Sequence, residues 1–386
     1  MTVALEVVFW LSAALIVWTL LGYAGALAAL AWVLRARARE GPAGQATAEL
    51  PLLSLIVAAH DEESVIAAKV QNALALDYPR ERLEVIVACD GCSDRTAELA
   101  RGAGGDLVLE LPRGGKIRAQ DAAVQSAHGE IVAFSDANAT WESGAARALI
   151  SAFADPGVGY ACGQVSFVRD GGGREGANQE GVYWRYELAV RALESRLSSV
   201  TAGNGAIYAT RREAYIVVDP IMGHDLSLPF NMVKRGLRAV YVPDARASEK
   251  MVPSLAGEFA RKRRMMSHAW PILLRGGMLS PRGYTPGYAV MIVSHRLLRY
   301  CTPALHALAL AANVALLALG AGPLYLVTLV LQLALVAAAA LAGVVSFRPL
   351  LIARYYVLTT ASPAAGLWDW LRHGTSASWE AAEGTR

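Results

Sequence analysis

The stretch EIVAFSDANATW, residues 130–141, decides how the middle of this chain is interpreted. Its apolar or small residues 131–135 end abruptly on Asp136, and Asn138 follows two positions later. Asp and Asn commonly form turns, because their side chains hydrogen-bond to the local backbone and tolerate tight geometry. The alternative is a metal or phosphate site at the carboxyl end of a parallel strand, the edge where open α/β sheets bind their ligands.

The surrounding residues favour the ligand site. Short apolar runs alternate with helix-like segments, at residues 52–59, 83–90, 106–111 and 130–136. This alternation is typical of parallel βαβ units and predicts an α/β fold. The second run ends on Asp90 as the last ends on Asp136, so both carboxylates are expected at the same edge of one sheet. Two such strand ends are harder to explain as turns than one.

The region beyond residue 150 is less regular. We predict a loop over 170–176, a helix over 183–197, a turn and strand over 203–215, and a helix, glycine stop and strand over 223–245.

The distribution of apolar residues predicts membrane segments. Hydrophobic residues make up 54% of the 386 residues, and residues 7–34 carry no charge over a length sufficient to cross a bilayer. Two more apolar blocks lie within 303–347. We expect a transmembrane helix over 1–35, a linker over 36–50, a soluble domain over 51–275, an interfacial segment over 276–300, two transmembrane helices over 301–347, and an interfacial or third transmembrane segment with a tail over 348–386.

The positions of the basic residues predict the orientation. Arg35, Arg37 and Arg39 follow the first apolar run, so the positive-inside rule puts the soluble domain in the cytoplasm. Residues 355–371 could cross the membrane, but Arg372 and His373 would then emerge outside. We therefore favour an interfacial helix there, with a cytoplasmic carboxyl terminus.

Charge and cysteine content exclude some classes of protein. A net charge of +3 without an aromatic-rich basic groove argues against a nucleic-acid partner. Cys89 and Cys92 form a C-x-x-C motif, but no second pair completes a zinc site, so buried or incidental thiols are expected.

Several polar residues could carry chemistry. Asp136 is a hard oxygen ligand of the kind that Mg²⁺ or Mn²⁺ prefers, and Lys116 follows two glycines that would let it approach a phosphate. Asp225 could be a general base for an incoming hydroxyl or a plain helix cap. The cations of 261–264 could hold a leaving diphosphate or face lipid headgroups.

The order of these motifs resembles that of the membrane-bound family 2 glycosyltransferases of bacteria, which use a Rossmann-like GT-A fold for nucleotide sugars. "VACDGCSDRT", "GKIRAQDAA", "FSDANA", "GHDLSLP" and "RKRRM" are similar to that family's motifs and occur in the same order. The resemblance is distant to the hyaluronan, chitin and poly-N-acetylglucosamine synthase group.

The resemblance implies an inverting, metal-dependent transfer of a sugar from a nucleotide-sugar donor to a lipid or glycan acceptor. It implies a multi-pass protein of the bacterial inner membrane, in contact with membrane lipids. By analogy, Asp225 is the catalytic base, and Asp136 and Asn138 bind Mg²⁺ or Mn²⁺. The implied donor-binding residues are Asp61, Glu62, Asp90, Lys116, Asp136 and Arg264. The implied acceptor-binding residues are Asn204, Gly205, His224, Met265 and Trp270.

Departures from the family pattern leave alternatives open. Asn138 and His224 replace carboxylates, which would suit a non-catalytic protein that binds a nucleotide sugar or a lipid-linked glycan. A nucleotidyltransferase would share the half-sheet and the metal carboxylate. Met265 stands where processive members have an acceptor-stacking Trp, so we expect transfer of one or a few sugars rather than a long polymer.

Overall fold

The computed structural model describes residues 2–34, 49–168, 179–250, 255–345 and 347–377. A mixed eight-stranded sheet forms its centre, in the order β3-β2-β1-β4-β7-β6-β8-β5. The strands are β1 (Leu53–Ala59), β2 (Leu83–Asp90), β3 (Leu107–Leu111), β4 (Ile131–Asp136), β5 (Thr140–Trp141), β6 (Val158–Val168), β7 (Tyr208–Arg211) and β8 (Arg238–Lys250). The four predicted strands are therefore confirmed to within one residue, and β1–β4 form the predicted parallel half.

The sheet contains both parallel and antiparallel strand pairs. β2 and β4 both pair in parallel with β1, one on each side, whereas β7 runs antiparallel to β4 and β6. The predicted strand within 203–215 is confirmed as β7, and the strand within 223–245 continues to Lys250. The predicted loop over 170–176 and most of the linker over 36–50 lie outside the described residues.

Helices cover both faces of the sheet because successive strand residues point to opposite sides. In β4, Phe134 packs with residues of α5 and α8, whereas Ala133 packs with residues of α6. The helices of this region are α3 (Ile66–Leu74), α4 (Thr96–Gly102), α5 (Lys116–Ser126), α6 (Ala145–Ser151), α7 (Gln179–Leu197), α8 (His224–Lys234) and α9 (Leu255–Leu274).

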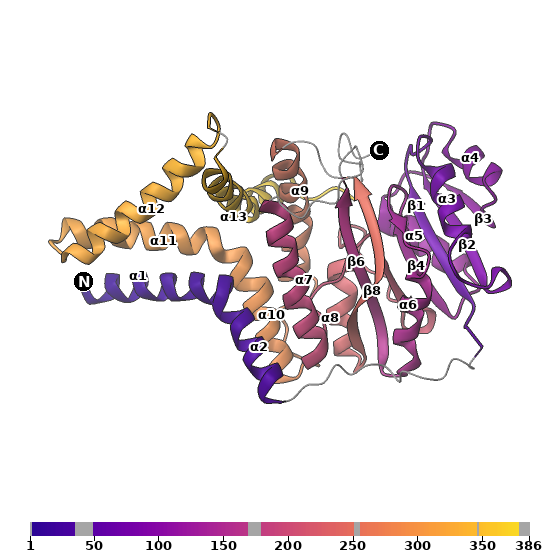
Figure 1. Ribbon diagram of the computed structural model, residues 1–386, viewed down its shortest axis with the longest axis horizontal. Coiled ribbons are helices and arrows are strands. Elements are labelled where there is room, and N and C mark those ends of the chain that lie inside the picture. The colour runs from indigo at the N-terminus through magenta and orange to yellow at the C-terminus, as the bar shows by residue number, and fades with distance from the viewer. Residues whose placement is uncertain (1, 35–48, 169–178, 251–254, 346, 378–386) are drawn as a thin grey trace.

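The apolar helices project away from this sheet. Figure 1 shows α1, α11 and α12 extending to one side, with the sheet at the opposite end of the molecule. The elements are α1 (Thr2–Val17), a π-helical turn (Trp18–Gly22), α2 (Tyr23–Val33), α10 (Pro286–Ile292), α11 (Leu298–Ala318), α12 (Pro323–Leu341) and α13 (Arg348–His373). Among the described residues, three helices are long and apolar enough to cross a membrane: Thr2–Val33, Pro286–Ala318 and Pro323–Leu341.

The second of these helices begins earlier than the sequence suggested. It starts at Pro286 and runs through Pro303, so much of the predicted interfacial segment over 276–300 is continuous with it. A small cluster that includes Phe9, Leu316 and Tyr325 joins α1, α11 and α12. Large apolar side chains on the outside of these helices remain exposed, as expected for surfaces that face lipid.

The last helix packs against the soluble domain. α13 lies along α9, and Gly366 permits the close approach because a Cβ there would come within 2.6 Å of the Met266 Cβ. Arg263 of α9 donates to the Asp369 carboxylate of α13 at 2.5 Å. α13 is not among the three candidate spans.

Candidate active site

The carboxyl ends of three parallel strands form the edge on which the site is built. The register places Ala58 of β1 beside Asp136 of β4, and Ala59 beside Cys89 of β2. Asp90 and Asp136 therefore lie at the same edge, as predicted, but β1 separates their strands.

Asp90 shapes the turn that precedes α5. Its carboxylate, 1% exposed, accepts hydrogen bonds from the backbone N–H groups of Gly114 at 2.6 Å and Gly115 at 3.0 Å. Arg113 lies 3.3 Å from the same carboxylate. Gly115 has φ +95°, a left-handed conformation that favours glycine. Asp90 thus fixes the glycine turn from which Lys116 extends.

Lys116 and Asp136 form the central ion pair of the site. Burial would lower the pKa of Lys116, but the carboxylates of Asp136, Asp225 and Glu249 raise it above its ordinary value. The lysine therefore carries its charge at neutral pH, in a position surrounded by acidic groups. A concentrated group of carboxylates around one ammonium is an arrangement that could also accommodate a divalent cation.

Glu249 is a member of this group that the sequence analysis missed. Burial, and then the charge of Asp136, raise the pKa of Glu249 to about 7. The signal was present in the period-two pattern of β8, where Ala245 and Ala247 are buried and Glu249 follows on the same face. The predicted strand ended at residue 245 and therefore did not include Glu249, whereas β8 continues to Lys250.

Asp225 lies in the first turn of α8, and its charge contributes to raising the pKa of Lys116. Its backbone carbonyl accepts a 2.6 Å hydrogen bond from the Gly203 N–H. Its half-buried carboxylate has no hydrogen-bond or ion-pair partner within the part of the chain that the structure describes. The structure thus gives no side-chain cap at the start of α8, which the alternative interpretation of Asp225 required.

The loop before β7 brings two predicted residues to the same place. A Cβ on Gly205 would lie 4.0 Å from the Lys116 ammonium nitrogen, and a Cβ on Gly203 would clash with the Tyr160 hydroxyl. The side-chain nitrogen of Asn204 is buried and makes no hydrogen bond to the described residues. A buried amide without a partner is costly and suggests that a ligand or water completes it.

His224 is buried rather than open to an acceptor. Its Nδ1 lies 3.0 Å from the Tyr208 hydroxyl and its Nε2 3.2 Å from the Tyr215 hydroxyl. The Tyr215 hydroxyl also donates to Asp121 at 2.6 Å. Burial, and then the charge of Lys116, lower the pKa of His224 to about 3. His224 is therefore a neutral, buried group that packs among aromatic side chains at the start of α8.

The predicted residues of α9 are spread along the helix. Arg261 and Lys262 pair with Glu258, and Arg263 pairs with Asp369. Arg264 is exposed and has no side-chain hydrogen bond or ion pair to the described residues.

Met265 and Trp270 differ in accessibility. Met265 is 50% exposed, whereas Trp270 is 6% exposed and donates to the Pro363 carbonyl at 2.8 Å. An acceptor could stack on Trp270 only if α13 moved away from α9. Met265 is the more accessible of the two predicted acceptor residues.

The carboxyl-terminal segment reaches the same edge, which the sequence analysis did not foresee. The Thr375 hydroxyl donates to the Ser267 carbonyl at 2.8 Å. A Cβ on Gly115 would clash with the Ala377 carbonyl oxygen, so this segment lies directly over the turn that leads to Lys116.

A mixed sheet with helices on both faces, and with acidic residues at its parallel carboxyl edge, is the architecture of the GT-A glycosyltransferase class. The structure resembles the mannosyltransferase PcManGT from Pyrobaculum calidifontis, solved with GDP-Man and Mn²⁺. The TM-score is 0.64 at 24% identity, over 95% of this chain and 99% of that one. This similarity establishes the fold.

The sequence establishes the family. The family model described as "Glycosyltransferase like family 2" matches residues 51–267, more than half of the chain. The chain therefore belongs to glycosyltransferase family 2.

The matches to curated relatives extend over only part of this chain and part of each relative. An N-acetylglucosaminyltransferase of Rhizobium meliloti is 30% identical over 236 residues, 55% of each chain. A beta-monoglucosyldiacylglycerol synthase of Synechocystis is 33% identical over 176 residues, 41% of this chain and 35% of that one. The chain spans about half the length, or less, of these curated relatives.

Proposed function

We propose that this protein transfers a sugar from a nucleotide-sugar donor to a lipid or glycan acceptor, with inversion at the anomeric carbon. The observation that carries the proposal is the position of Asp225 in the first turn of α8, where its backbone carbonyl accepts a hydrogen bond from the Gly203 N–H and its charge raises the pKa of Lys116. A base on one side and a phosphate-binding group on the other are what a direct displacement requires.

Different residues of the chain act on the acceptor and on the leaving group. Asp225 accepts the proton of the acceptor hydroxyl as the acceptor oxygen bonds to the anomeric carbon. The bond from that carbon to the phosphate oxygen breaks, and the nucleoside diphosphate leaves. Lys116, a half-buried ammonium, and Arg264, an exposed guanidinium on α9, offset the negative charge of the diphosphate. One displacement inverts the configuration of the sugar.

A divalent cation fits the site. Asp136 and Glu249 are two carboxylates close enough that one raises the other's pKa, and Asn138 adds an amide oxygen two residues after Asp136. Oxygen ligands suit Mg²⁺ or Mn²⁺. In the structure, the Lys116 ammonium supplies positive charge at this position. When bound, the cation would neutralise charge on the donor diphosphate.

The predicted donor residues of the first strands have a supporting role. Glu62 is 3% exposed, and its carbonyl accepts hydrogen bonds from Val65 and Ile66 at the start of α3. Asp61 binds the Ser93 N–H at 2.7 Å. We assign Asp61 and Asp90 to the nucleoside end of the donor, since both lie at the β1–β2 edge.

The acceptor is proposed to approach from the membrane. The loop that contains Asn204 and Gly205 lies beside Asp225 and Lys116. Met265 is exposed on α9. The relative named for synthesis of a glucosyldiacylglycerol supports a lipid acceptor, and the relative named as an N-acetylglucosaminyltransferase supports an amino-sugar donor. Membership of a glycosyltransferase family argues against the nucleotidyltransferase alternative.

We propose that the protein spans the bacterial inner membrane with its sheet domain in the cytoplasm. The arginines after the first apolar run support this orientation. The contact between Thr375 and Ser267 supports a carboxyl terminus on the same side as that domain.

The test is a panel of nucleotide sugars offered to purified membranes, with release of nucleoside diphosphate as the readout. We expect one donor to be consumed only when a divalent cation is present, and not by an Asp225→Asn variant. Nucleotide-sugar binding without turnover under all conditions would instead favour the non-catalytic alternative.

A further inference from the structure

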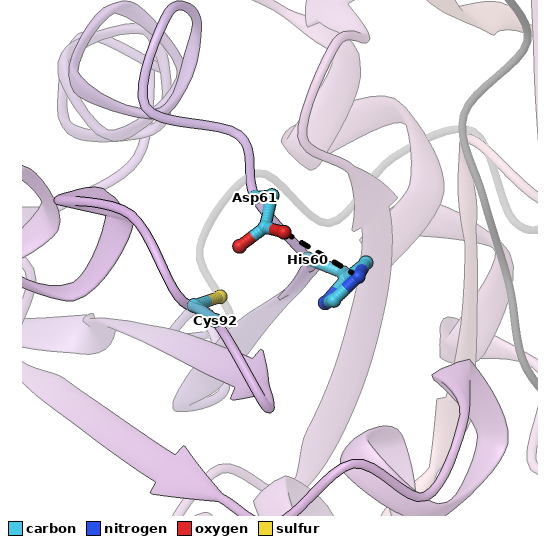
Figure 2. A group of neighbouring side chains, drawn as sticks. All are labelled: His60, Asp61 and Cys92. Carbon is cyan, nitrogen blue, oxygen red and sulfur yellow. Dashed lines mark ion pairs between the residues drawn. The ribbon is translucent and has the colours of Figure 1, made fainter.

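Three side chains at the β1–β2 edge converge in a way that the transfer reaction does not require. His60, Asp61 and Cys92 each offer one ligand atom, and these atoms lie within 4.8 Å of one another (Figure 2). His60 Nε2 is 3.6 Å from Asp61 Oδ2. His60 and Asp61 follow β1, and Cys92 follows β2, so the cluster depends on parallel pairing of strands far apart in sequence.

His60 is oriented by a hydrogen bond through one of its two ring nitrogens. Its Nδ1 lies 2.7 Å from the Asp90 carbonyl oxygen, which can only accept a hydrogen bond. Nδ1 therefore carries the proton in the neutral ring, and Nε2 presents its lone pair towards Asp61. A backbone carbonyl that orients the imidazole through its other nitrogen is the usual outer partner of a metal-binding histidine.

Asp61 is held in place from two directions. Its φ of +50° is a left-handed conformation that costs energy for a residue with a side chain. The Ser93 N–H donates to Oδ1 at 2.7 Å and so ties the carboxylate to the turn that contains Cys92. The strained backbone and this hydrogen bond hold the Asp61 carboxylate close to the other two side chains.

The ligand chemistry differs from that of the Asp136 region. An imidazole nitrogen, a thiolate sulfur and a carboxylate oxygen suit Zn²⁺, whereas Mg²⁺ and Mn²⁺ prefer oxygen ligands. Three protein ligands leave the fourth tetrahedral position open to water. A second cysteine pair is not needed for this zinc site. His60 and Asp61, which follow a different strand from Cys92, supply the other two ligands.

We propose that His60, Asp61 and Cys92 bind a zinc ion, and that zinc held there excludes the nucleoside end of the donor. The zinc site rests on the geometry of these three residues alone. The competition with donor rests on the proposed function, which assigns the same edge to the nucleoside. The protein would then be inhibited by zinc at a site separate from the one that supports transfer.

Cobalt(II) is the probe for the site, used on the purified full-length protein in detergent. We expect one cobalt per chain, with a thiolate-to-cobalt charge-transfer absorption that stoichiometric zinc abolishes. Cys92→Ser should remove this absorption, and Cys301→Ser, which alters a partly exposed thiol on α11, should retain it. Absence of the absorption in the wild-type protein, or its persistence in Cys92→Ser, would overturn the site.

Two further variants keep the test independent of folding defects. His60→Ala and Asp61→Asn should each weaken cobalt binding at least about 10-fold, the lower limit for loss of even an outer partner. Asn tolerates the left-handed conformation at residue 61, so this variant should keep the local fold. Unchanged cobalt affinity in both variants would show that Cys92 binds metal with other partners and would contradict the assignment.

Competition is measured as the affinity for nucleoside diphosphate at saturating Mg²⁺, with and without zinc. Zinc should weaken the wild-type affinity for nucleoside diphosphate, increasingly as the zinc concentration rises, and leave the affinity of Cys92→Ser unaffected. If zinc weakened nucleotide binding equally in both proteins, the competition would occur at the Asp136 oxygens. That result would contradict competition at the site formed by His60, Asp61 and Cys92. If no nucleotide binds but the cobalt absorption is present, the proposed function fails and the zinc site stands; nucleotide binding without that absorption gives the reverse result.

Discussion

His295 Nδ1 lies 2.7 Å from Glu194 Oε1, in a contact that joins the apolar helices to the sheet domain. The Glu194 carboxylate, which is fully buried, also accepts hydrogen bonds from the Tyr23 hydroxyl of α2 at 2.6 Å and from the Thr201 N–H at 3.0 Å. One carboxylate therefore holds the amino-terminal helix, the segment that leads into α11 and the loop that leads to Asn204. The Nε2 of His295 also lies 3.3 Å from Glu187 Oε2, so the stretches YWRYE (183–187) and SHRLLRY (294–300) meet at this point.

We expect His295→Ala to destabilise the protein strongly. Removing one partner from a buried ion-pair network typically costs about 3–5 kcal/mol, because the remaining charge stays buried. His295→Gln, which keeps a donor towards Glu194, should lose less. Thermal inactivation in detergent measures the effect, with exposed His373→Ala as the control. Equal stability of all three variants would show that the network contributes little.

Asp225→Asn should lower turnover by about two or more orders of magnitude while preserving donor binding. A positioned base contributes roughly 100-fold or more to the rate, and an amide cannot accept the proton. The matched control is Asp219→Asn, an exposed carboxylate six residues earlier. Nucleoside diphosphate release and donor affinity are measured in parallel. Ordinary turnover in Asp225→Asn would remove this residue from the mechanism.

Asp136→Ala should weaken nucleotide binding only when Mg²⁺ or Mn²⁺ is present. The carboxylate is expected to act through the cation, so a chelator should make the wild-type and variant affinities alike. Glu249→Gln should show a smaller loss of the same kind, and Asp244→Ala, an exposed position on β8, should show none. Calorimetric titration with nucleoside diphosphate gives the affinities. A loss that is the same in chelator would make Asp136 structural.

Stability should fall on mild acidification because of His224. Its pKa is lowered from 6.5 to about 3, first by burial and then by Lys116, so below pH 6.5 only the unfolded chain takes up the proton. The free energy of unfolding should therefore decrease as pH falls from about 6.5 towards 3, by up to about 1.4 kcal/mol per pH unit, and be unaffected by this group above 6.5. Tyr208 and Tyr215 contact the ring, and Asp121 reaches it through Tyr215.

The measurement is the difference between the unfolding midpoints of the wild-type and His224→Gln proteins between about pH 5 and 6.5. The comparison is needed because Glu249, whose pKa is raised to about 7, binds a proton in the folded state there and has the opposite effect. His224→Gln should flatten the pH dependence there, whereas His128→Gln, at an exposed histidine, should not. An unchanged slope in His224→Gln would mean that another group causes it.

The carboxyl terminus should be inaccessible from outside the cell. α13 packs along α9, and the segment that follows it contacts Ser267, so a crossing over 355–371 would separate these elements. A single cysteine introduced at Ser378 should resist an impermeant thiol reagent in intact cells and react after permeabilisation. Labelling of intact cells would show that the helix crosses and that the predicted topology is one span short.

The sequence by itself determined the parallel half of the sheet and the edge at which Asp90 and Asp136 lie. Apolar runs of strand length that alternate with helices carry this information locally, because strand and helix periods are visible within a few residues. The apolar helices were also predictable, since length and absence of charge suffice for a bilayer-spanning segment.

Only the tertiary structure decided which side chains meet. Glu249 lies beside Asp136 because β8 continues five residues beyond the predicted strand, and Trp270 is buried because α13 folds back onto α9. His60, Asp61 and Cys92 converge because β1 and β2 pair in parallel. Each of these contacts joins residues at least about 30 positions apart, and no local periodicity encodes such pairings, because they depend on strand order and helix packing.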